Sequence, residues 1–121
     1  MSKRILIVED TEDNRQIVRD LIATTDFELI EAVDGAAGVA AAAAQMPDLI
    51  LMDIQLPVLD GYEAARRIKA DPAIRHIPII AVTSYALSGD EAKAIAAGCD
   101  GYVAKPFSPR RLLAMINEFL S

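Results

Sequence analysis

The chain has 121 residues, of which 53% are hydrophobic and 25% are charged, a balance typical of one compact domain. Its formal charge of −6 has the wrong sign for a protein that neutralises nucleic-acid phosphates, so we expect no direct nucleic-acid binding. The single cysteine, Cys99, excludes an intramolecular disulfide, and the apolar run Ile5–Val8 is too short for a signal peptide or a membrane span. We therefore expect a cytoplasmic protein without membrane insertion, with residues 1–121 forming a single domain.

Short β-rich apolar runs alternate with longer helical patterns along the chain. The first, third and fourth runs are continuously apolar, as in central parallel strands that helices cover on both faces. This alternation predicts an α/β fold with a doubly wound parallel sheet. The expected strands are Ile5–Val8, Phe27–Val33, Leu49–Met52, Ile77–Val82 and Tyr102–Ala104.

The helical patterns fill the intervals between these strands. The first helix is indicated by the stripe Ile17, Val18, Leu21 and Ile22, and the second by the alanine-rich segment 36–44. The third follows the capping residue Asp60 and covers residues 61–70. The fourth begins at the capping box of Ser88 and Glu91 and ends at Gly98, and the last begins at Ser108 and Pro109.

Polar residues stand where four of the expected strands end. Glu9 and Asp10 follow the first strand, Asp53 the third, Thr83 and Ser84 the fourth, and Lys105 the fifth. Ligands of open parallel sheets bind outside the carboxyl ends of the strands. If the first, third, fourth and fifth strands are neighbours, three carboxylates, a hydroxyl and an ammonium converge there.

Such a cluster has a specific chemistry. Two ionised carboxylates about 4 Å apart repel by roughly 4 kcal/mol at an effective dielectric near 20, and a divalent cation relieves this repulsion. All-oxygen ligands favour a hard ion such as Mg²⁺. Asp53 could then accept a phosphoryl group as an acyl phosphate, while Lys105 and Thr83 stabilise the phosphoryl oxygens.

Four motifs carry a family resemblance in the same order: ILIVED, DLILMDIQLPVLDG, IPIIAVTSYA and GCDGYVAKP. From Arg4 to Leu120 the sequence resembles the receiver domains of two-component response regulators, in the CheY-like superfamily. Through VED, LMDIQLP and HIPIIAVT it is most similar to stand-alone, DivK-like receivers. The resemblance implies a flavodoxin-like (βα)5 fold with strand order 2-1-3-4-5 and no effector domain.

The resemblance also implies roles for individual residues. A sensor histidine kinase or histidine phosphotransferase would donate phosphoryl to Asp53 in the presence of Mg²⁺. Lys105 is similar to the phosphoryl-binding lysine, Thr83 to the switch hydroxyl and Tyr102 to the aromatic switch. The implied metal ligands are Glu9, Asp10, Asp53 and the backbone carbonyl of Gln55, and the positions that tune water access to the phosphoryl group are Gln55, Ser84 and Tyr85.

The implied output is protein binding rather than enzyme turnover. Phosphorylation would shift a pre-existing equilibrium in the surface of the fourth helix, the fifth strand and the fifth helix. We expect a downstream protein, or a second copy of this chain, to bind there.

Three other functions compete with this hypothesis. An aspartyl phosphatase of the haloacid-dehalogenase type needs a second aspartate two residues after the nucleophile, where this chain has Gln55. A flavin or nucleotide module is disfavoured because residues 9–13 are acidic rather than glycine-rich. An unphosphorylated pseudo-receiver stays open as an alternative, although such proteins lose acidic or lysine positions that this chain retains.

Overall fold

The computed structural model describes residues 2–83, 90–105 and 108–120. Its strands are β1 (Arg4–Val8), β2 (Glu28–Ala32), β3 (Leu49–Asp53), β4 (Ile79–Thr83) and β5 (Gly101–Ala104). They form one five-stranded sheet in the order β2-β1-β3-β4-β5, and all four neighbouring pairs are parallel. The predicted α/β class and strand order are therefore confirmed.

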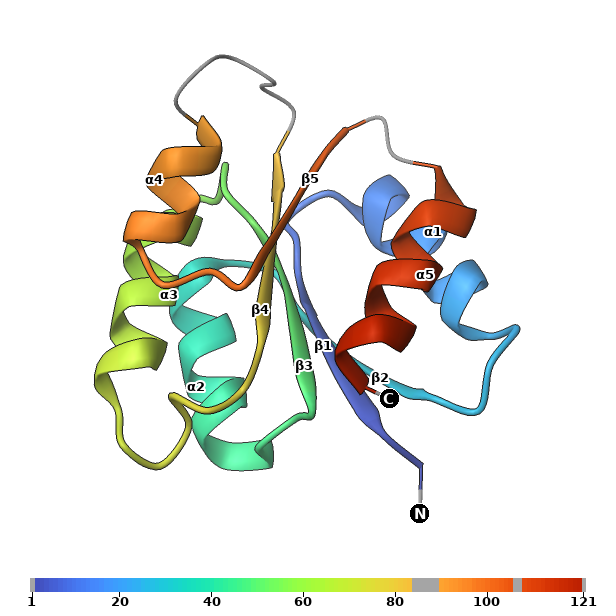
Figure 1. Ribbon diagram of the computed structural model, residues 1–121, viewed down its shortest axis with the longest axis horizontal. Helices are drawn as coiled ribbons and strands as arrows, with labels where there is room; N and C mark the ends of the chain where they lie inside the picture. Colours follow the sequence, from blue (N-terminus) through green and yellow to red (C-terminus); the bar gives the residue numbers. More distant parts are fainter. Residues whose placement is uncertain (1, 84–89, 106–107, 121) are drawn as a thin grey trace.

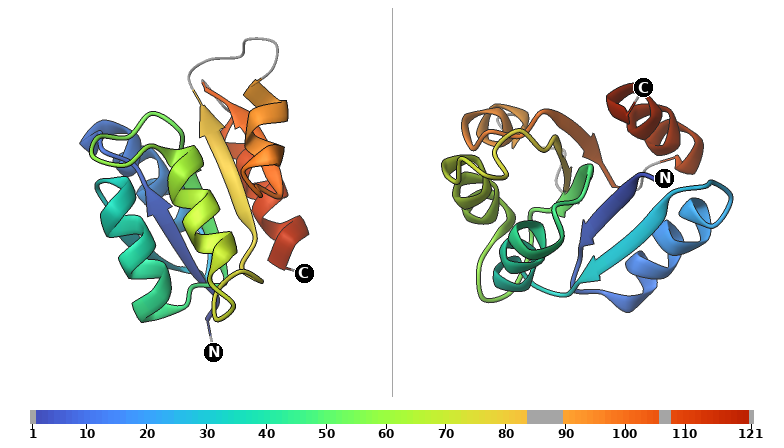
Figure 2. Two further views of the ribbon diagram at one scale, coloured as in Figure 1. Left: turned by 90° about the vertical axis from the view of Figure 1, so that its left-hand side faces the viewer. Right: turned by 90° about the horizontal axis from the view of Figure 1, so that it is seen from below.

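Helices cover both faces of this sheet. They are α1 (Glu12–Ile22), α2 (Gly35–Gln45), α3 (Gly61–Ala70), α4 (Asp90–Ala96) and α5 (Pro109–Leu120). Helices α1 and α5 lie on one face, and α2, α3 and α4 lie on the other (Figures 1 and 2). In the part of the chain that the structure describes, no helix has the length and apolar character needed to cross a membrane.

The strand bounds differ from the prediction at a few residues. Strand β4 begins at Ile79 rather than Ile77, because Pro78 has no N–H for the ladder and contributes its carbonyl to Ile50. Strand β2 is two residues shorter than predicted and leaves out Phe27 and Val33. The capping residue Ser88, expected at the start of the fourth helix, lies outside the described residues.

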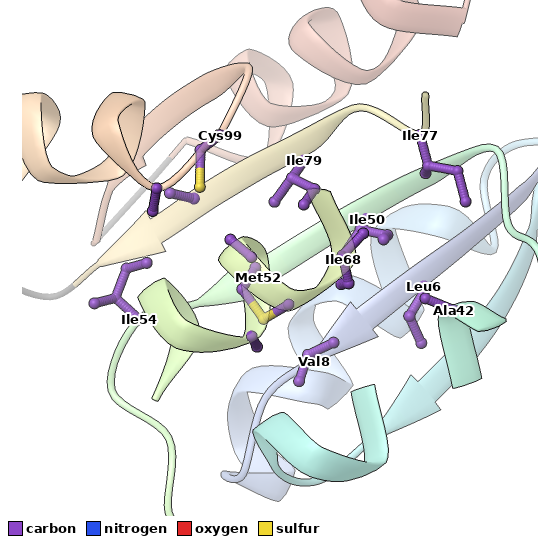
Figure 3. Close-up of a cluster of buried hydrophobic side chains, with 14 of the residues drawn as sticks. Leu6, Val8, Ala42, Ile50, Met52, Ile54, Ile68, Ile77, Ile79 and Cys99 are labelled. Atoms are coloured by element: carbon purple, nitrogen blue, oxygen red, sulfur yellow. The ribbon is translucent and has the colours of Figure 1, made fainter. Parts of the chain in front are cut away.

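Side-chain alternation divides the core into two halves. Leu6, Met52 and Ile79 face α2, α3 and α4 (Figure 3), whereas the adjacent Ile7, Leu51 and Ile80 face α1 and α5. Because β1, β3 and β4 are covered on both faces, they are apolar almost throughout. The alternation also decides which face each strand-end residue joins.

A charged pair fastens the amino end of the sheet. The Lys69 ammonium donates to the carbonyls of Arg75 and Ile77 at 3.1 and 2.8 Å and to Asp100 Oδ2 at 2.9 Å. The same carboxylate oxygen accepts the N–H of Ile79 at 2.9 Å. Gly98 adopts a φ of 99°, and an added Cβ there would lie 2.7 Å from Lys69 Cγ. The pair thus joins α3, the start of β4 and the turn that follows α4.

Candidate functional site

Three charged residues continue the half of the core that faces α1 and α5. Glu9, Asp53 and Lys105 each stand two positions after a buried residue of that half, namely Ile7, Leu51 and Val103. Since side chains two apart on a strand share a face, all three side chains lie on the same side of the sheet at its carboxyl end. Glu9 and Asp53 are only 2% and 4% exposed.

The charged groups contact one another directly. Lys105 Nζ donates to Glu9 Oε1 at 2.6 Å and lies 3.5 Å from Asp53 Oδ2. Backbone amides hold the other carboxylate oxygens: Glu9 Oε2 accepts the N–H of Thr11 at 3.3 Å, and Asp53 Oδ1 accepts the N–H of Gln55 at 3.2 Å. The carboxylates are therefore oriented by the turns that follow β1 and β3.

Asp10 completes a group of three carboxylates. One oxygen each from Glu9, Asp10 and Asp53 lies within 4.8 Å of the others. Asp10 is exposed, so this group opens to solvent on one side. Three hard oxygen donors around one point, with the Lys105 ammonium beside two of them, fit a divalent cation such as Mg²⁺.

Proximity and burial change how the two buried carboxyls titrate. Burial raises the pKa of Asp53 to about 7, and the hydrogen bond and negative charge of Glu9 add to this increase. For Glu9, burial opposes ionisation, but hydrogen bonds from Asp53 and Lys105 outweigh it and lower its pKa. Without a cation, Asp53 is therefore the first carboxyl of the pair to take up a proton as the pH falls.

Thr83 and Tyr102 lie on the opposite face of the sheet. Thr83 stands two residues after Ala81, and Tyr102 is the β5 partner of Ala81 in the ladder. Ala81 belongs to the half of the core under α2, α3 and α4, and Tyr102 packs against that half. Thr83 is 1% exposed and shares with Gln55 a cleft of about 510 Å³ that reaches Tyr62 and Lys93.

The loop between β3 and α3 holds Asp53 in place by backbone packing. The Gly61 N–H donates to the Ile54 carbonyl at 3.0 Å, and a Cβ on Gly61 would lie 2.2 Å from the Asp53 carbonyl oxygen. In the same loop the Leu59 N–H donates to the Pro57 carbonyl at 2.7 Å. This tight turn gives the 85% exposed Val58 a φ of 69°, a strained value for a β-branched residue.

The structure thus places the predicted site residues in two groups. Glu9, Asp10, Asp53 and Lys105 meet as the strand-end argument expected, whereas Thr83 and Tyr102 lie across the sheet from them. Ser84 and Tyr85 lie outside the described residues.

Asn14 is a site residue that the sequence motifs do not predict. This residue lines a small cavity beside Glu9, Asp53 and Lys105. An available signal was its spacing, because an amide four residues after Asp10 lies one helical turn into the helix that follows the acidic loop.

The chain is similar to the proteins of one known family. Residues 5–117 match the model of the response regulator receiver domain. The polar-differentiation response regulator DivK of Brucella ovis is 43% identical over 120 residues, which cover 99% of this chain and 98% of DivK.

Two solved structures show how far the likeness extends in space. The receiver domain of the sensor histidine kinase PA1611 from Pseudomonas aeruginosa, with a magnesium ion in its active site cleft, superposes with a TM-score of 0.92. It is 38% identical, and the match covers 99% of this chain and 98% of that one. A CheY-like receiver domain protein from Methanospirillum hungatei gives a TM-score of 0.90 at 32% identity, covering 99% and 94%.

Proposed function

This chain belongs to the response regulator receiver domain family, and we propose that Asp53 accepts a phosphoryl group from a sensor histidine kinase or a histidine phosphotransferase. Proteins of this family act in two-component signalling rather than as classical enzymes. The observation that carries the proposal is the buried contact of Asp53 with Glu9 and Lys105 at the carboxyl end of the sheet. We also propose that residues 1–121 form one receiver domain, which the family match over residues 5–117 supports.

The proposed transfer moves one phosphoryl group between two proteins. A carboxylate oxygen of Asp53 attacks phosphorus, a P–O bond forms, and the P–N bond to the donor imidazole breaks with its electron pair left on nitrogen. The Gln55 N–H fixes the orientation of the attacking carboxylate. Lys105, 3.5 Å from Asp53 Oδ2, is placed to neutralise a phosphoryl oxygen as charge builds up there.

We propose that Glu9, Asp10 and Asp53 hold Mg²⁺, with the Gln55 carbonyl as a further ligand. The three carboxylate oxygens within 4.8 Å of one another support this assignment, as does the magnesium ion in the related PA1611 receiver domain. When bound, the ion supplies positive charge that neutralises phosphoryl oxygens. The chain's own contribution is to aim both buried carboxyls at one point, through the backbone N–H groups of Thr11 and Gln55.

We propose Thr83 and Tyr102 as the switch that relays phosphorylation to the other face of the sheet. Their shared face supports this role, because a Thr83 hydroxyl drawn toward a phosphoryl group on Asp53 would leave space on the side of Tyr102. Of the three proposed tuning residues, Gln55 is the one that lies within the described residues, and it is exposed two positions after Asp53. We keep Ser84 and Tyr85 as tuning residues on the resemblance alone.

The proposed output surface is formed by α4, β5 and α5. It carries the 63% exposed Ile95 on α4, and α4 packs beside the strand that bears Tyr102. The occupant would be a downstream protein or a second copy of this chain. A cytoplasmic location is proposed as well, and the free, buried Cys99 is compatible with a reducing compartment.

Incubation with phosphoramidate and Mg²⁺ tests the proposal. Mass spectrometry should show the addition of one phosphoryl group that is stable in acid and labile in base, and fragmentation should place it on Asp53. Hydrogen exchange of the phosphorylated protein should change in α4, β5 and α5.

The matched controls are two aspartate-to-asparagine variants. Asp53→Asn should not incorporate phosphoryl, whereas Asp26→Asn, at an exposed position before β2, should behave as wild type. Equal incorporation by wild type and Asp53→Asn would contradict the proposal. No incorporation by either protein would favour the pseudo-receiver alternative.

A further inference from the structure

A small cavity is lined in part by the clustered Glu9, Asp53 and Lys105. Its volume is about 10 Å³, close to the smallest that can hold one water molecule. Apolar side chains from β1, β3, β4, α1 and α5, such as Leu51 and Leu112, form most of its wall. The polar part of the wall consists of the three charged residues and Asn14.

Asn14 brings a carboxamide to the wall of this cavity. It lies in the first turn of α1 and is half-buried. With the residues that the structure describes, its carboxamide forms no hydrogen bond. A partly buried carboxamide is more stable with a hydrogen-bond partner than without one, so an ordered solvent partner is favoured.

Lys105 also has capacity left at the same cavity. An ammonium has three N–H donors, and within the described residues Lys105 Nζ uses one for Glu9 at 2.6 Å and approaches Asp53 at 3.5 Å. At least one donor is therefore available. A water molecule in the cavity would have up to four polar groups around it, which meets the two to four partners that buried waters need.

We propose that this cavity holds one water molecule, which accepts a hydrogen bond from Lys105 and donates one to the carboxamide oxygen of Asn14. Asn14 is then a positioning residue that restrains the Lys105 ammonium at the phosphoryl site. This inference rests on the proposed phosphorylation of Asp53. It adds to the site a residue and a solvent position.

The water-mediated contact between Asn14 and Lys105, here called the tether, has a role in the transfer reaction. Lys105 must move its closest contact from Glu9 to a phosphoryl oxygen, and a cation bound by Glu9 would weaken the existing ion pair. A neutral tether keeps the ammonium near Asp53 without adding a charge that competes with the phosphoryl group. An asparagine amide fits this requirement, whereas an aspartate would not.

The test replaces the amide by a group of similar size that cannot bind water. With phosphoramidate and saturating Mg²⁺, Asn14→Leu should lower the rate of phosphorylation by about tenfold, the size expected for one hydrogen bond to a charged group. The affinity for Mg²⁺ should change less than about twofold, because Asn14 is not among the three clustered carboxylates. Asn14→Ser, which restores a hydroxyl and leaves room for water, should recover most of the rate.

Two controls separate positioning from a structural effect. Gln16→Leu makes the same kind of change on the exposed side of α1, where the amide donates to Asp20, and should leave the rate unchanged. In a Lys105→Met background, Asn14→Leu should have no further effect on the rate, because the residue acts through Lys105. A tenfold loss in that background as well would overturn the positioning role.

A crystal structure of the wild type should show density for one water between Asn14 and Lys105, and the Asn14→Leu structure should lack it. An empty cavity in the wild type, or an unchanged rate in Asn14→Leu, would overturn the proposal while leaving Asp53 as acceptor. Failure of wild type to incorporate phosphoryl would instead contradict the function proposed above, and the density would still decide the water site.

Discussion

Each end of the sheet carries a lysine beside a carboxylate, and the two ends differ in how completely these groups are satisfied. At the amino end, Lys69 donates to two carbonyls and to Asp100, and Asp100 also accepts a backbone N–H. At the carboxyl end, Lys105 faces two buried carboxyls, and the pKa of one of them, Asp53, is raised to about 7. The first arrangement stabilises the fold, whereas the second leaves charged groups that can bind a ligand.

This difference shows how one domain can separate stability from function. The satisfied pair joins three elements of the fold. The unsatisfied group costs stability in the free protein, and an added cation or phosphoryl group relieves that cost. The strained Val58 lies at the carboxyl end too, where functional sites commonly keep unfavourable backbone geometry.

The largest expected effect is at the amino end. Lys69→Met should lower the free energy of unfolding by about 3 kcal/mol, because two carbonyls and a carboxylate lose their common donor. Urea denaturation measures this change. Lys3→Met, at an exposed lysine, should stay within about 0.5 kcal/mol of wild type. Equal effects of the two variants would show that the Lys69–Asp100 pair does not stabilise the fold more than an exposed lysine does.

A smaller effect of opposite sign is expected at Asp53. Because its pKa is raised, Asp53 takes up a proton on folding when the pH lies between its usual pKa of about 4 and about 7. The group therefore stabilises the folded state at low pH, and this contribution is lost as the pH rises through about 7. An asparagine side chain at this position does not titrate. Asp53→Asn should therefore be more stable than wild type by about 2 kcal/mol at about pH 8 without divalent cations, and by less at about pH 5.

The lowered pKa of Glu9 acts in the other direction, since its contribution is present above its usual pKa and is lost in acid. That loss falls below about pH 5 and does not mask the effect of Asp53. Denaturation in the presence of a chelator at several pH values is the measurement. A difference between variant and wild type that stays constant with pH would count against the raised pKa of Asp53.

The smallest expected effect concerns the turn beside Asp53. Val58→Gly should raise the free energy of unfolding by about 1 kcal/mol, because glycine adopts the φ of 69° without the strain of a β-branched residue. Val33→Gly is the matched control, since Val33 is also exposed but its φ is not positive. It should lose about 0.5 kcal/mol through added freedom of the unfolded chain. Destabilisation by both changes would show that the turn stores no strain.

Much of the fold and of the acidic site was predictable from local pattern. Continuous apolar runs identified the central strands, and the residues just after them identified Glu9, Asp53 and Lys105, because parallel strands bring their carboxyl ends to one edge. By the same reasoning, Thr83 is expected in the same place. Side chains alternate along β4, and Ile80 and Val82 face α1 and α5. Thr83 is an odd number of positions from both, so it lies on the other face.

Other features depend on contacts between distant segments and have no local signature. Lys69 and Asp100 are separated by 31 positions and meet only when α3 packs beside the turn before β5. Gly61 resembles an ordinary turn glycine in sequence, yet its α-carbon packs against the Asp53 carbonyl. The role of Asn14 likewise follows from a cavity that exists only once α1 and α5 cover the sheet.

The contact between Lys69 and Asp100 has a mechanical consequence for helix α4. It holds the chain just beyond the C-terminal end of this helix, where Gly98 also abuts Lys69. The helix has seven residues and is about 10 Å long. A rigid rod that is fastened at one end turns about that end as a lever. Displacement of α4 would therefore grow along its length and be greatest near Asp90, the end that lies toward the carboxyl edge of the sheet (Figure 1).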